Sequence, residues 1–291
     1  MAAFTTRPEI TGTFGVATST HWLASSVGFG MLEKGGNAFD AAAAMGFVLQ
    51  VVEPHLNGPG GEVPALVYSS DQDRVRVLCG QGTAPAGATI EKYRSEGLEL
   101  IPGSGLLATV VPGAFDAWML MLLEYGSLPL RDILEPAIYY ARHGHPVLER
   151  VSMAIGGLVE MFQKEWPSSA ETWLPGGTPP KPGSLFRNPV LADTWERVLA
   201  EAESVSGREA QIEKARSCFS RGFIAEAIGD YLSTAEVMDG TGERRAGVLT
   251  ADDMANWSAR FEEPLTAEYG DWTVCKTGPW GQGPVMLQAL Q

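Results

Sequence analysis

Apolar residues run without a single charge from Ala41 to Val52, which makes this stretch the strongest pattern in the chain. A helix that is apolar on all sides is a buried helix, so we expect this one in the middle of a sizeable fold. Gly35 and Gly36 are able to end a preceding helix, and Asn37 with Asp40 three positions later resembles a capping box. The pattern therefore predicts two consecutive helices with a short connection.

Period-two and period-3.6 patterns predict further elements along the chain. Alternation across polar turns predicts two β-hairpins, one over 64–69 and 74–79 and one over 265–268 and 273–276. A run of small and β-branched residues predicts a strand over 13–19. Helical spacing covers 21–34, 113–124, 130–142, 190–202 and 208–217. Helices alternating with hairpins are typical of an α+β fold with helices packed on antiparallel sheet. We expect residues 1–291 to form a single domain.

The segment 166–189 is rich in Pro, Gly, Ser and Thr, and it contains the aromatic residues Trp166, Trp173 and Phe186. Apolar periodicity resumes on both sides of it. We therefore expect a surface loop or lid, anchored by its aromatic side chains, and not a linker between domains.

Composition narrows the class of protein. The 291 residues have a formal net charge of −14, which argues against nucleic acid or an anionic membrane as a partner, because both need a basic face. No apolar run is long enough to span a bilayer. Residues 1–8 lack the basic-then-apolar order of a signal peptide, so the chain as given is expected to be cytoplasmic, or periplasmic or secreted if a leader was removed. Cys79, Cys218 and Cys275 are odd in number and far apart, which favours reduced thiols.

Several motifs resemble, in order, those of the gamma-glutamyltranspeptidase family of N-terminal-nucleophile hydrolases. The family's large chain has a "GGNAxDAAVA…VVEP…GxGG" signature, to which residues 35–61 are similar. The other similar segments are 81–85 ("RETAP"), 111–113 ("VPG"), 125–144 ("YGxLPW…L.PAI.LARxGF"), 219–225 ("FYxGxIA"), 247–253 ("GGLTxxDL") and 277–283 ("PPPSxGG"). A set of landmarks spread over nearly the whole chain is much harder to reach by chance than any one of them.

The resemblance implies the large-chain part of a four-layer αββα sandwich, completed by a small chain. In the family the precursor cleaves itself, and the new N-terminal threonine of the small chain becomes the nucleophile. Its own α-amino group titrates near neutral pH and is able to act as its base. That threonine would lie after Gln291, so we assign no catalytic residue to this chain. We expect a small-molecule amide as the substrate, and neither a cofactor nor a metal.

The family's "RETAP" arginine binds the α-carboxylate of gamma-glutamyl substrates, but Gln81 stands at that position, followed by Gly82 in place of glutamate and by Thr83. We expect Gln81, Gly82 and Thr83 to contribute to substrate binding. The uncharged amide of glutamine replaces the permanently charged guanidinium of arginine, so the free energy of carboxylate binding should weaken by about 1.5–3 kcal/mol. This favours relatives that hydrolyse other amides, such as acyl side chains or oxamate. The alternative is that Gln81 is only a surface loop residue and that a nearby arginine, Arg74 or Arg76, binds the substrate instead.

Other motifs have structural explanations. The loop 57–61 lacks the Lys-Ser/Thr of a phosphate-binding loop, so a tight turn is the better interpretation. His143 and His145 have no third metal ligand in view and fit a helix C-terminus. Thr250 to Asp253 resembles a capping box, so Asp252 and Asp253 are expected to be structural.

The segment 283–291 begins as an apolar helix with a proline in its first turn. It stops without a polar tail, so we expect a cut or processed chain that is not stable alone. A second hypothesis from a different class is therefore a truncated or degenerate, non-catalytic family member.

Overall fold

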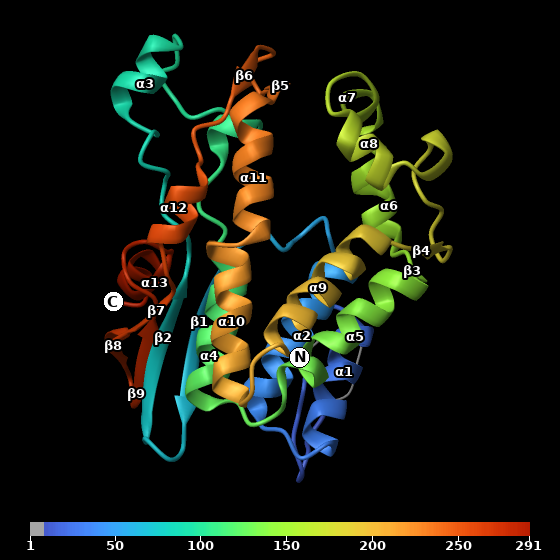
Figure 1. Cartoon of the computed structure of the whole chain (residues 1–291). Coiled ribbons are helices and arrows are strands. Elements are labelled where there is room, and N and C mark those ends of the chain that lie inside the picture. Colours follow the sequence, from blue (N-terminus) through green and yellow to red (C-terminus); the bar gives the residue numbers. More distant parts are fainter. Residues whose placement is uncertain (1–8) are drawn as a thin grey trace, which may run out of the picture.

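The computed structural model describes residues 9–291 (Figure 1). The helices are α1 (Trp22–Glu33), α2 (Ala38–Val52), α3 (Ile90–Ser95), α4 (Ala114–Tyr125), α5 (Leu130–His143), α6 (Glu149–Gly156), α7 (Val159–Lys164), α8 (Pro167–Trp173), α9 (Pro189–Ala202), α10 (Arg208–Ser220), α11 (Phe223–Thr234), α12 (Ala251–Asn256) and α13 (Gly283–Ala289). The strands are β1 (Val63–Ser69), β2 (Arg74–Gly80), β3 (His145–Pro146), β4 (Leu185–Phe186), β5 (Glu236–Met238), β6 (Arg244–Ala246), β7 (Arg260–Glu262), β8 (Leu265–Tyr269) and β9 (Trp272–Lys276). The fold class is α+β, as predicted.

The two consecutive helices at the start of the chain form as their caps predicted. Gly35 has a φ of 89°, a conformation that ends α1 without the steric cost another residue would have. Asn37 and Asp40 form a complete capping box at the start of α2. The body of α2 is buried, with Phe47 and Val48 fully inaccessible to solvent. The expectation of a buried central helix is confirmed.

Asp40 is also the point at which two distant segments of the chain are joined. Its carboxylate is fully buried and accepts hydrogen bonds from the backbone N–H groups of Asn37 (2.9 Å), Ser127 (3.0 Å) and Leu128 (3.2 Å), and from the Ser127 hydroxyl (2.7 Å). Asn37 donates in turn to the carbonyl oxygen of Tyr125 (2.6 Å). The start of α2 is thereby fixed to the turn between α4 and α5.

The main sheet has the strand order β1–β2–β7. The hairpin β1–β2 is antiparallel and pairs Leu66 with Val77 and Tyr68 with Val75, the alternation that the sequence predicted. Strand β7, which was not predicted, pairs with β2 from about 180 residues further along the chain. In Figure 1 the sheet lies on one side of the molecule, α4 and α10 lie next to it, and α1, α2, α5 and α9 lie beyond them.

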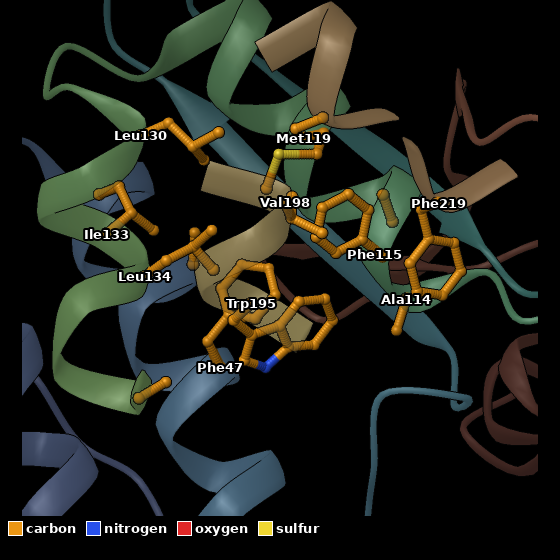
Figure 2. Packing of buried hydrophobic residues seen from close by; sticks show 14 of the residues in the cluster. Phe47, Ala114, Phe115, Met119, Leu130, Ile133, Leu134, Trp195, Val198 and Phe219 are labelled. Atoms are coloured by element: carbon orange, nitrogen blue, oxygen red, sulfur yellow. The ribbon is translucent and has the colours of Figure 1, made fainter. Parts of the chain in front are cut away.

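Aromatic side chains from four helices meet in the main core (Figure 2). Phe115 of α4 stacks on Trp195 of α9 at 5.4 Å between ring centroids and on Phe219 of α10 at 4.7 Å. Phe47 of α2 meets Phe115 and Trp195 edge to face. Such pairs contribute about 0.5–1.5 kcal/mol each beyond the area that they bury. They fix α9 and α10 against the buried helix.

The segment 166–189 is more ordered than predicted. It contains α8 and β4 together with a short 3₁₀ turn at Pro175–Gly177. Trp173 stacks on Phe186 at 5.5 Å, and Trp166 packs against the same small second core, so the prediction of aromatic anchors is confirmed. The loop prediction missed α8 because proline at its first position starts a helix as readily as it marks a turn.

Two other predictions about local structure need correction. Residues 13–19 are not a strand, because no strand of the described residues pairs with them and an unpaired extended segment forms no ladder. His145 does not end a helix but begins β3 and is 1% exposed. The hairpin β8–β9 and the helix α13 form as predicted. Within residues 9–291, no helix is long and apolar enough to cross a membrane. Residues 1–8, used for the signal-peptide argument, lie outside the described residues.

Candidate functional site

Three backbone segments that contain the family-like motifs converge at the N-terminus of α4. The N–H group of Val111 donates to the carbonyl oxygen of Thr83 at 3.0 Å. The N–H groups of Gly113 and Ala114 both donate to the carbonyl oxygen of Gly61, at 3.1 and 2.9 Å. The segment that follows β2, the segment 111–113 and the glycine-containing loop 57–61 are therefore held side by side.

Loop 57–61 is a tight turn, as predicted, with the N–H group of Gly61 donating to the carbonyl oxygen of Gly58 at 2.9 Å. The glycines around it are required for close approach of backbone to backbone. An ideal Cβ built on Gly113 would overlap the carbonyl oxygen of Gly80, and one built on Gly82 would overlap the carbonyl oxygen of Val111. The glutamate that follows the family's arginine has no room at Gly82 unless the backbone moves.

Gln81 and Gly82 are half-buried just beyond the end of β2, and the side chain of Thr83 is exposed. The arginines considered as replacements lie elsewhere. Arg76 precedes Gln81 by five residues, about 17 Å along an extended strand. Its guanidinium bonds to Glu124 and to the hydroxyl of Tyr125 and lies over a phenylalanine ring. Arg76 therefore already has partners of its own, away from Gln81.

Arg74 lies still further from Gln81, next to the β1–β2 turn, where it faces Glu263 at 3.9 Å. The uncharged Gln81 thus has neither of the two candidate arginines beside it. We keep Gln81, Gly82 and Thr83 as a predicted substrate-binding segment.

The first turn of α4 is held by a charged cluster below the converging segments. Asp116 accepts from the Arg216 guanidinium at 2.7 and 3.0 Å and from the N–H group of Ala259 at 2.7 Å. The side chains of Asp116 and Arg216 are only 10% and 17% exposed. The neighbouring carboxylate raises the pKa of Arg216. Because each partner satisfies the other, this pair positions α4 and offers no free charge to a ligand.

A cavity of about 920 Å³ opens beside this site, between α9 and α11. Its lining includes Gly60 and Pro112 of the converging segments, but not Gln81. Sequence reasoning did not identify this cavity. The available signal was the i, i+4 spacing of Phe223, Ala227 and Tyr231, which places these three cavity-lining residues on one face of α11.

The other titratable groups considered from the sequence either cap a helix or are buried. Thr250 and Asp253 form the predicted capping box of α12. Burial lowers the pKa of His145 and of His21, which favours the neutral form of both imidazoles. Among residues 9–291, no group of three or more His, Cys, Asp or Glu side chains is placed to hold a metal ion.

The site is formed by the segments whose motifs are family-like, and direct comparison identifies that family. The family model described as "Gamma-glutamyltranspeptidase" matches residues 24–291. The chain belongs to the gamma-glutamyltranspeptidase family.

Several curated relatives are named as proenzymes. The chain is 32% identical to a glutathione hydrolase-like YwrD proenzyme of Bacillus subtilis, covering 97% of this chain and 49% of that protein. It is 33% identical to an oxamate amidohydrolase proenzyme of Klebsiella pneumoniae, covering 96% and 49%. The chain therefore spans about half the length of these relatives.

Solved structures show the same fold. The structure of LmbA2991T421A is similar with a TM-score of 0.96 and 56% identity, covering 99% of this chain and 49% of that one. The gamma-glutamyltranspeptidase of Helicobacter pylori is similar with a TM-score of 0.80 and 27% identity, covering 95% and 73%. The fold is that of the N-terminal-nucleophile hydrolases, as the motifs implied.

Proposed function

We propose that the chain is the large-chain part of an amidohydrolase or acyltransferase that cleaves an amide bond with an N-terminal threonine on a companion chain. The relatives' names, which include "proenzyme", and the half-length coverage support a second part. The threonine hydroxyl would attack the amide carbonyl while its own α-amino group takes the proton. The amine then leaves, and water or another acceptor releases the acyl group.

The observation that supports this proposal most directly is the convergence of the family-like segments at the N-terminus of α4. In this proposal the chain supplies the frame and one side of the substrate pocket, with Gln81, Gly82 and Thr83 next to the substrate. Because Gln81 is uncharged, the substrate is not a standard gamma-glutamyl compound. A carboxylate there would lose a partner worth about 1.5–3 kcal/mol, or roughly tenfold or more in affinity.

The test uses the full-length protein, with residues 1–291 alone as the control. Mass spectrometry should detect cleavage that exposes a threonine. The value of kcat/KM should then be higher for 4-nitroacetanilide, which has an uncharged acyl group, than for the γ-(4-nitroanilide) of glutamic acid. Higher efficiency on the glutamyl compound would refute the substrate assignment. Absence of both processing and turnover would favour the alternative of a degenerate member that folds or binds without catalysis.

A further inference from the structure

We propose that the cavity between α9 and α11 receives the acyl group of the substrate, and that this group is bulky, apolar and uncharged. The inference rests on the proposed function and adds the substrate class. The cavity volume of about 920 Å³ lies within the range of small-molecule sites, about 300–1,000 Å³. The elements that enclose it can be followed in Figure 1.

The lining is dominated by hydrocarbon. Six large apolar side chains from α11 and the connecting loops face the cavity, namely Leu106, Val110, Phe223, Ile228, Leu232 and Leu249. Contact with such a surface removes apolar ligand area from water, which is the main source of affinity for an uncharged acyl group. A charged group would lose its hydration without gaining a partner.

The two charged residues in the lining are already paired with other protein side chains. Asp193 accepts from Arg142 at 2.8 Å. Arg197 donates to Glu201 at 3.3 Å, and its guanidinium lies over the ring of Phe223 at 3.8 Å. The stacked guanidinium therefore fixes one wall of the cavity. Both side chains are largely exposed, at 68% for Asp193 and 60% for Arg197, and each charge is partly offset by its partner, so hydrocarbon remains the dominant surface of the cavity.

The cavity borders the converging segments at two positions, and residues 81–83 are not in its lining. Gly60 and Pro112 border the cavity. Pro112 lies between Val111 and Gly113, whose N–H groups hold Thr83 and loop 57–61 in place. In this proposal an amide bound beside Gln81 extends its acyl group past Pro112 into the cavity. An uncharged acyl group also agrees with the uncharged side chain of Gln81.

The test measures acyl selectivity of the complete, processed protein. The substrates are the 4-nitroanilides of acetic, hexanoic and phenylacetic acid, and the quantity is kcat/KM. We expect the hexanoyl and phenylacetyl compounds to exceed the acetyl compound by about tenfold or more, since one methylene group in an apolar pocket contributes about tenfold or more to selectivity. Equal efficiency for all three would overturn the inference while leaving the proposed function in place.

A pair of alanine-to-tryptophan variants localises the effect. Ala227 on α11 lines the cavity, whereas Ala200 on α9 is exposed and lies outside its lining. Ala227→Trp should lower kcat/KM for the larger acyl groups by about tenfold and leave the acetyl compound nearly unchanged. Ala200→Trp should change neither. Equal effects of the two variants would refute the assignment of the cavity.

A cavity-enlarging variant covers the case in which Ala227→Trp does not fold. Ile228→Ala should shift preference further toward phenylacetyl, and an unchanged preference would overturn the inference. If Ala227→Trp instead prevents association with the companion chain on size-exclusion chromatography, while Ile228→Ala leaves selectivity unchanged, the cavity holds a segment of that chain and not the substrate. Absence of turnover with every anilide in the unsubstituted protein would refute the proposed function itself.

Discussion

Replacing Asp40 by alanine should destabilise the protein more than any single change in its exposed ion pairs. The carboxylate is fully buried and is shared by the N–H groups of Asn37, Ser127 and Leu128 and by the Ser127 hydroxyl. These four donors come from two segments nearly 90 residues apart in the sequence. Asp40→Ala removes the capping box of α2 and the attachment of the α4–α5 turn in one step.

The magnitude follows from the donors that are left behind. A buried donor without a partner costs about 1–3 kcal/mol, and a hydrogen bond to a charged group is worth about 1.5–3 kcal/mol. The donors here belong to half-buried or exposed residues, so the lower ends of these ranges apply. The four bonds share one carboxylate, so their energies do not add, and water is able to reach part of the vacated space. We therefore expect a loss of about 4 kcal/mol, a large share of the stability of a typical domain.

Three further variants separate the contributions. Asp40→Asn keeps the shape but turns an amide N–H toward the donors, so it should cost nearly as much as alanine. Ser127→Ala removes only the hydroxyl and should cost about 1 kcal/mol. Asp132→Ala breaks an exposed contact with Lys34 at 3.5 Å and should cost less than about 0.5 kcal/mol.

The assay is urea unfolding of the complete protein, followed by tryptophan fluorescence and far-UV circular dichroism. Coincident transitions and an unchanged m-value would allow the midpoints to be read as differences in stability. If Asp40→Ala lies within about 1 kcal/mol of Asp132→Ala, the buried carboxylate does not hold these segments together. The reasoning from the hydrogen-bond network would then be wrong.

The remaining predictions concern specificity, pH and thiol chemistry. Gln81→Arg should raise the ratio of glutamyl to acetyl turnover by up to about a hundredfold, the upper limit of one charge-assisted bond, and an unchanged ratio in a folded protein would show that this segment does not lie next to the substrate. Burial lowers the pKa of His145 below its ordinary 6.5, so on acidification through 6.5 the unfolded chain takes up a proton before the folded protein does. Stability should therefore fall as the pH drops below 6.5, and His145→Gln should reduce that dependence in urea unfolding at pH 8 and pH 5.5; equal slopes would contradict it. Burial raises the pKa of Cys218 to about 11, so in the native protein iodoacetamide at pH 8 should alkylate the half-buried Cys275 and spare Cys218, as peptide mass spectrometry would report; equal labelling would contradict the burial of Cys218.

Local sequence was sufficient wherever the determining interactions are themselves local. The capping box at Asn37 and Asp40, the positive φ at Gly35 and the register of the β1–β2 hairpin each depend on residues a few positions apart. The family also followed from sequence, because its motifs lie in order over most of the chain. The role of Gln81 was inferred from that order alone, and it remains a prediction.

The tertiary structure decided everything that depends on distant partners. Residues 13–19 have the composition of a strand but no strand of the described residues beside them, whereas β7 becomes a strand because β2 lies next to it. The absence of space for a side chain at Gly82 comes from the Val111 carbonyl, which no pattern around residue 82 contains. The cavity likewise needs two helices and a loop that meet only after folding. Sequence fixes local backbone preferences, but the free energy that selects among them comes from burial and pairing between segments far apart in the chain.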